Sequence, residues 1–151
     1  MTARALHVHD HAHGPVAGHV SLNYDARMLR RKRLVTDAGE PFMVDLPQTT
    51  SVDAGHVFVL EDGRQIMVKA ADEALMRVTG DLTRLAWHIG NRHSPCEILP
   101  DALVVQREKV MRAMLEQLGA QVVDFDGPFT PEGGAYGHGR TMGHDHSHSH
   151  A

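Results

Sequence analysis

The chain has 151 residues, a formal net charge of −4 at pH 7 with its 13 histidines neutral, and 42% hydrophobic residues, which is typical of a soluble globular protein of one or two small domains. The acidic balance argues against a nucleic-acid-binding protein, and no apolar run approaches the roughly 18 residues of a membrane-spanning helix, so we expect neither nucleic acid nor membrane as a partner. The single cysteine, Cys96, excludes an internal disulfide, and the N-terminus lacks the apolar stretch of a secretory signal peptide, so we expect a cytoplasmic protein.

The first 18 residues carry a histidine tract, HVHDHAH, which holds His7, His9, His11 and His13. A repeat of two residues fits no helical face, and its spacers are too small or polar to predict a core strand. We therefore predict that residues 1–18 are flexible when no metal is bound.

Residues 19–69 predict a small β domain, because apolar runs alternate with turn signals and no helical period is present. One strand is expected at 42–46, with Pro47 as its end. Strands at 56–60 and 65–69 flank Asp62 and Gly63, a turn pair that is typical of a β-hairpin.

Residues 70–130 show a mixed pattern of helices and strands. Strands are predicted at 73–78, 96–99, 102–106 and 121–125. One helix is expected to begin at Asp81 and to end at Gly90–Asn91, and a second helix over 110–118 is expected to end at Gly119. The resulting βαββαβ order is that of a ferredoxin-like domain, so the predicted fold class is α+β.

The last segment, residues 131–151, is rich in glycine and histidine and is predicted to be a flexible tail. Its histidines are His138, His144, His146, His148 and His150. Neutral imidazole binds Zn²⁺, Ni²⁺ and Cu²⁺, so alternate histidines at both ends of one short chain favour metal binding over a solvated tail. A purification tag is a weaker alternative, because tags normally carry consecutive histidines. The tracts alone do not rank nickel above zinc or copper.

Between the first 19 residues and the C-terminal tail, the chain holds only His56, His88 and His93. His93 is expected in a loop, and a single exposed histidine supplies two ligands if it lies on the two-fold axis of a dimer. The string HIGNRHSP at 88–95, followed by an amphipathic helix that ends in Leu118–Gly119, resembles the UreE family of urease accessory proteins. The resemblance covers roughly residues 20 to 150 and is strongest from 63 to 119.

This resemblance implies a homodimeric nickel metallochaperone rather than an enzyme. The family pairs a β domain, likened to a peptide-binding chaperone module, with a ferredoxin-like domain that binds metal and dimerises. The family's interfacial metal ligand ends the GNRH string and corresponds to His93, and histidines of the tail, here in the group from His144 to His150, complete that site. The family hands Ni²⁺ to the accessory GTPase and apo-urease complex. Which tail histidine binds, and whether two dimers share one ion, stay open.

The sequence also departs from the family pattern. Some members carry a second His-x-His pair at the start of the second helix, where this chain has Arg107 and Lys109, so we expect that auxiliary site to be absent. The N-terminal tract is not a general family feature, and it either compensates for the missing pair or buffers metal.

Two other residues are weaker metal candidates. Cys96 follows His93 by three residues, but a buried, inert thiol is favoured, and His88 beside Trp87 is favoured as a packing residue. The main alternative function is a general zinc or nickel store without a dedicated client, and a peptide-binding co-chaperone with incidental histidines is a third. No catalytic motif is present, so we do not expect an enzyme.

Overall fold

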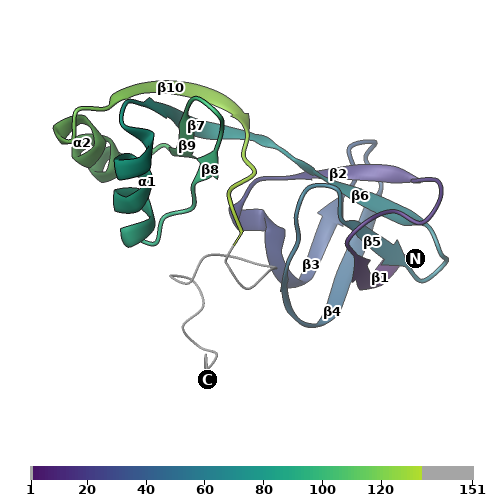
Figure 1. The fold of residues 1–151 in the computed structure, drawn as a ribbon. Helices are drawn as coiled ribbons and strands as arrows, with labels where there is room; N and C mark the ends of the chain where they lie inside the picture. The colour runs from purple at the N-terminus through teal and green to yellow at the C-terminus, as the bar shows by residue number, and fades with distance from the viewer. Residues whose placement is uncertain (1, 134–151) are drawn as a thin grey trace. The chain divides into compact units, whose positions relative to one another are not determined.

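The computed structural model describes residues 2–133, which fold into two compact units (Figure 1). The first unit ends at Ala71 and the second begins at Asp72, two residues after the predicted domain boundary. Most of the predicted tail, with His138, His144, His146, His148 and His150, lies outside the described residues. None of the helices in residues 2–133 is both long and apolar enough to span a membrane.

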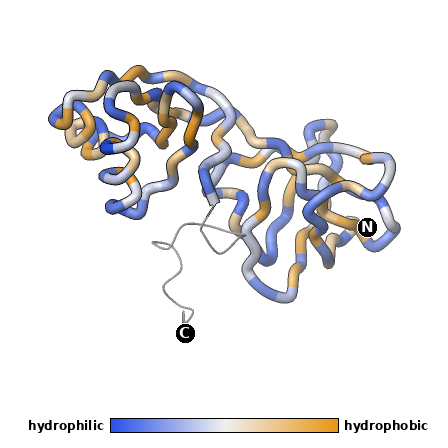
Figure 2. The backbone as a smooth tube through the Cα atoms, in the orientation of Figure 1, coloured by the Kyte–Doolittle hydropathy of each residue, from blue (hydrophilic) through white to orange (hydrophobic). Residues whose placement is uncertain are grey.

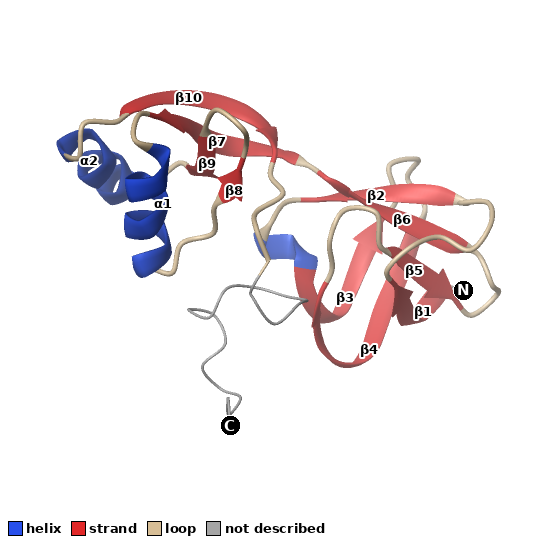
Figure 3. Cartoon of the chain, viewed as in Figure 1, coloured by secondary structure: helices blue, strands red, loops and turns tan. Residues whose placement is uncertain are grey.

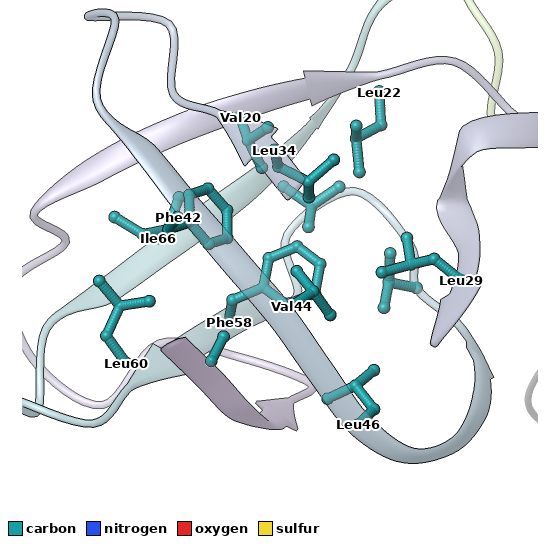
Figure 4. Packing of buried hydrophobic residues seen from close by; sticks show 13 residues of the cluster. Val20, Leu22, Leu29, Leu34, Phe42, Val44, Leu46, Phe58, Leu60 and Ile66 are labelled. Carbon is teal, nitrogen blue, oxygen red and sulfur yellow. The ribbon is translucent and has the colours of Figure 1, made fainter. Parts of the chain in front are cut away.

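The first unit is a β domain built on one six-stranded sheet in the order β2-β6-β5-β1-β4-β3. Its elements are β1 (Ala3–His9), β2 (Gly18–Leu22), a 3₁₀ turn η1 (Asp25–Arg27), β3 (Met28–Val35), β4 (Pro41–Ser51), β5 (Val57–Leu60) and β6 (Gln65–Ala70). The predicted hairpin is confirmed, since β5 pairs antiparallel with β6. Side chains from β2 to β6 meet in one core, where the rings of Phe42 and Phe58 lie 5.7 Å apart (Figure 4).

The N-terminal histidine tract begins as a strand, so the predicted flexibility of residues 1–18 is wrong for Ala3–His9. Strand β1 lies between β5 and β4 in the sheet, and Ala5 is fully buried. The register with β5 shifts between Ala5 and His7, and after this bulge Val8 packs on the core while His7 and His9 are exposed. The tract therefore follows ordinary strand alternation, which the bulge conceals in the sequence.

Strand β4 also runs further than predicted, because it continues through Pro47 to Ser51. Its register with β3 shifts between Leu29 and Arg31, opposite the segment that contains Pro47. Proline has no backbone N–H to donate to a neighbouring strand, and such an irregularity in an outer pair of strands accommodates it. The predicted stop at Pro47 is therefore wrong.

The second unit has the predicted βαββαβ order (Figure 3). Its elements are β7 (Asp72–Thr79), α1 (Leu82–Asn91), β8 (Glu97–Ile98), β9 (Leu103–Gln106), α2 (Lys109–Gln117) and β10 (Gln121–Pro128). The strands form an antiparallel sheet in the order β10-β7-β9-β8, with both helices on the same side of it. The mixed α+β class is thus confirmed.

Both helices of the second unit bury one apolar face. Leu85 and Ile89 of α1, with Met111 and Leu115 of α2, pack against side chains of β7 and β9. Figure 2 shows hydrophobic and hydrophilic stretches alternating along both helices. The packing holds α1 rigidly along its inner face and leaves its C-terminal end in solvent.

Candidate metal centre

Helix α1 begins and ends where the sequence predicts. Asp81 caps its N-terminus, since the Asp81 carboxylate accepts a hydrogen bond from Arg84 N at 3.2 Å. The predicted stop at Gly90–Asn91 is confirmed, because Asn91 is the last residue of the helix and Arg92 is its C-cap. The residue that turns the chain out of the helix is His93.

His93 closes α1 in a Schellman motif. Its N–H donates to the Gly90 carbonyl at 2.9 Å, and the N–H of Ser94 donates to the Ile89 carbonyl at 3.3 Å. This motif requires a left-handed backbone at the residue after the C-cap, and His93 has φ 59°. It is the one residue other than glycine with a positive φ within residues 2–133.

The second helix shows the ordinary form of the same motif. At the end of α2, Gly119 N donates to the Glu116 carbonyl and Ala120 N donates to the Leu115 carbonyl, both at 3.0 Å. Gly119 has φ 89°, and glycine adopts this conformation without strain. A residue with a Cβ costs roughly 1–2 kcal/mol in the left-handed region. Two equivalent helix ends therefore differ in one respect, which is that α1 carries an exposed imidazole at the strained position.

The outer face of α1 leads from this helix end to an exposed aromatic side chain. Trp87 is 63% exposed, and the half-buried ring of His88 meets it edge to face at 5.1 Å between centroids. Both line a shallow surface pocket of about 410 Å³ together with Asp81, Thr83 and Arg84. The ring of His88 thus packs against Trp87.

Cys96 lies just beyond His93 but packs against the core of the second unit. Its Sγ donates to the Glu97 carbonyl at 3.8 Å. Burial, reinforced by the carboxylates of Glu132 and Glu97, raises the pKa of the Cys96 thiol to about 11. A metal ligand must be the thiolate, so the structure favours the inert thiol.

The chain after β10 returns to this same region. The N–H of Glu132 donates to the Cys96 carbonyl at 2.8 Å, and the N–H of Thr130 donates to Glu97 Oε1 at 3.0 Å. The backbone of Glu132 is therefore bonded to Cys96, which follows His93 by three residues. The segment that leads into the histidine-rich C-terminus therefore starts beside Cys96 and Glu97.

The predicted ligands of the N-terminal tract lie in the first unit. His7 is exposed on β1, and the rings of His9, His11 and His13 gather where β1 ends. Within residues 2–133, no three His, Cys, Asp or Glu side chains stand in the positions of a preformed metal site. His93 accordingly has no ready-made set of partner ligands in the described part of its own chain.

Both units match one family of proteins. Residues 2–71 match the N-terminal domain of UreE urease accessory proteins, and residues 68–151 match the C-terminal domain. The chain belongs to the UreE family.

Curated members of the UreE family, each described as urease accessory protein UreE, are similar over most of the chain. The relative from Cereibacter sphaeroides is 58% identical over 133 residues, which are 88% of this chain and 73% of the relative. The relative from Rhodobacter capsulatus is 56% identical over 137 residues, 89% of this chain and 88% of the relative. The relative from Ruegeria pomeroyi is 60% identical over 128 residues, 84% of this chain and 86% of the relative.

In this member of the UreE family, Arg107 has a structural role. It stands at one of the two positions where some members carry a second His-x-His pair. Arg107 Nη2 donates to the Phe125 carbonyl at 2.9 Å and to Asp126 Oδ1 at 3.0 Å. The guanidinium thus ties the start of α2 to β10. The absence of the auxiliary site stays a prediction.

Sequence reasoning in this UreE chain missed two structural features. It did not predict the left-handed backbone of His93, because glycine is the usual signal for that position. It also did not predict that His9, His11 and His13 gather, because their proximity depends on a loop held by the distant Gln65.

Proposed function

We propose that this protein is a nickel chaperone for urease maturation, with Ni²⁺ as its cargo. Membership of the UreE family supports the link to urease, and the nickel assignment rests on the family resemblance together with the imidazole-rich ligand supply. The observation that carries the proposal is the backbone of His93, which holds an exposed imidazole at φ 59° where glycine is favoured. Strain of this kind is retained where the side chain has a function.

We infer that two copies of the chain share one ion through His93. A residue on the two-fold axis of a dimer meets its own copy, so one exposed histidine supplies two ligands. Trp87 on the outer face of α1 offers apolar surface of the type that is enriched in the centre of interfaces. Two imidazoles leave further coordination positions open, and the tail is the proposed source of the remaining ligands.

The path of the chain supports the contribution of the tail. Glu132 is hydrogen-bonded to Cys96, three residues after His93, and His144 lies twelve positions further along the chain. Twelve residues span at most about 40 Å when fully extended, which is ample for His144, His146, His148 or His150 to approach His93. An ion held partly by the tail is accessible for exchange, which suits delivery rather than storage.

The proposed recipient is the accessory GTPase that works with apo-urease, in the cytoplasm. Catalysis has no part in the proposal, because the chain donates an ion without making or breaking covalent bonds. Dimerisation brings the two His93 side chains together, and transfer follows when ligands of the recipient replace the tail histidines.

Activation of apo-urease tests this function. Wild type, His93→Ala and His93→Gly are compared at equal free Ni²⁺ in the presence of the accessory GTPase, with His88→Ala as the matched control. We expect both His93 variants to lose stimulation and His88→Ala to retain it. The glycine variant relieves backbone strain, so its loss of function cannot be ascribed to unfolding.

A nickel or zinc store without a client gives a different result. A store predicts that the wild-type protein activates urease no better than Ni²⁺ alone at the same free Ni²⁺ concentration. This result should not depend on the residue at position 93. Stimulation that survives in both His93 variants would instead remove His93 from the transfer site and favour the peptide-binding role.

A further inference from the structure

A second group of histidines gathers at the end of β1, in the first unit. His9 is exposed on the strand, and His11 and His13 follow in the loop that leads to β2. The rings of His9 and His13 lie 5.0 Å apart at right angles, and those of His11 and His13 lie 4.4 Å apart. His13 is thus in contact with both of the other rings.

The loop that carries these rings is held in place by a buried side chain. Gln65, only 8% exposed, accepts a hydrogen bond from His13 N at 2.8 Å through Oε1 and donates to the His13 carbonyl at 2.9 Å through Nε2. The neighbouring contact, from Ala17 N to the Gln65 carbonyl at 2.9 Å, fixes the far end of the loop. These bonds engage the backbone of His13 and leave its imidazole free to bind a ligand.

Asp10 prepares one of the rings for metal binding. Its Oδ1 lies 2.6 Å from Nδ1 of His11. Because the ionised carboxylate only accepts, the proton of the neutral His11 ring resides on Nδ1, and Nε2 presents its lone pair. A carboxylate that orients a histidine through its second nitrogen is the recurrent supporting contact of metal-ligating histidines.

We propose that His9, His11 and His13 form a second divalent-metal site in the first unit, with Asp10 as the residue that orients His11. The ligand chemistry is three imidazoles, which suits Ni²⁺, Zn²⁺ and Cu²⁺. The described side chains do not already stand as a metal site, so binding requires the exposed rings to rotate about their χ angles toward one ion. Three protein ligands leave a coordination position open, so the ion is exchangeable.

Two other histidines of the first unit, His56 and His19, are not part of the proposed ligand set. His56 uses its Nδ1 to accept the N–H of Asp53 at 3.2 Å, so its neutral ring is committed to a structural contact. His19 lies on β2, which is separated from β1 by β6 and β5 in the sheet. Neighbouring strands lie about 4.8 Å apart, so His19 lies roughly 14 Å from the strand that carries His9, and it serves as a histidine control outside the proposed set.

The test uses the full chain with the other proposed ligands removed. The background variant carries alanine at His93, His138, His144, His146, His148 and His150. Binding of Ni²⁺ and Zn²⁺ is measured by equilibrium dialysis with elemental analysis, and Co²⁺ absorption reports the ligand geometry. Three variants are made in this background. They are the double variant His11→Ala/His13→Ala, the single variant Asp10→Asn and the control His19→Ala.

We expect the background chain to retain one ion per chain, the His11/His13 double variant to lose it, and His19→Ala to keep it. Asp10→Asn should weaken binding by about 10- to 100-fold, since it removes the orienting carboxylate and not a ligand. Circular dichroism confirms that each variant is folded, as these side chains are exposed. A background chain that binds no ion, or a double variant that binds as well as the background, overturns the proposal. Both outcomes leave the His93 site untouched, because His93 is absent from every chain compared.

Discussion

Replacement of His93 by glycine should make the protein more stable while it removes the proposed ligand. The side chain of His93 is exposed, so its loss forfeits little packing. What changes is the backbone, because a residue with a Cβ at φ 59° is strained by roughly 1–2 kcal/mol and glycine is not. Glycine also has more conformational entropy in the unfolded chain, and this entropy cancels about 0.5–1 kcal/mol of the stability gained from the relief of strain. The net gain in the free energy of unfolding is about 0.5–1 kcal/mol.

The assay is thermal unfolding followed by circular dichroism and calorimetry in the absence of metal. For a domain of 60–100 residues, 1 kcal/mol corresponds to a shift in Tm of about 4–8 °C, so the second unit should melt about 2–8 °C higher in His93→Gly. His93→Ala retains the strain and should melt close to wild type.

Two matched substitutions check the cause. Arg92→Gly alters the preceding residue, whose φ of −88° suits any amino acid, and it should lower the Tm. Gly119→Ala makes the reverse change at the end of α2, where φ is 89° and a Cβ would meet no atom within 4 Å, so backbone strain alone should lower the Tm. If His93→Gly melts at or below the wild-type temperature while the two controls behave as expected, the argument from strain at His93 is wrong.

Three further outcomes follow from individual residues. Gln65→Ala should lower the free energy of unfolding by about 1–2 kcal/mol in denaturant titrations and weaken metal binding by the N-terminal site, whereas exposed Gln48→Ala should do neither. The N–H groups of Val110 and Met111 lower the pKa of the Glu108 carboxyl below 4.5, so its stabilising contribution is present above pH 4.5 and is lost as the pH falls through the folded-state pKa. Glu108→Gln should therefore lower the Tm at pH 7 and flatten its decline between pH 4.5 and 3, and an unchanged decline contradicts the cap. Since the pKa of Cys96 is about 11, alkylation by iodoacetamide at pH 8 should be at least about a hundredfold slower in the folded chain than in urea, and equal rates contradict its burial.

The fold of the second unit could be predicted closely from the sequence, because its helices and strands differ in hydrophobic period and Asp81 marks a helix start in a local, recognisable way. The errors fell where tertiary contacts override local signals. The bulge after Ala5 shifts the alternation of β1, and Pro47 is tolerated because the register with β3 shifts opposite it.

For the candidate site, the sequence pointed to a residue but not to its geometry, and the role of that residue stays a prediction. The GNRH string singled out His93, yet its conformation depends on a helix end at which histidine replaces the expected glycine. The gathering of His9, His11 and His13 needs Gln65, 52 positions beyond His13, and no local pattern reports a contact at that separation.

The central claim is that His93 from two copies holds one Ni²⁺ ion, and calorimetric titration of Ni²⁺ into the metal-free full chain tests it most directly. Wild type should show a first, tightest event at one ion per two chains, followed by weaker events from the histidine-rich ends. In His93→Gly the first event should disappear while the weaker events persist, and His88→Ala should match wild type. A tightest event that is unchanged in His93→Gly, or that saturates at one ion per chain in wild type, would contradict the account.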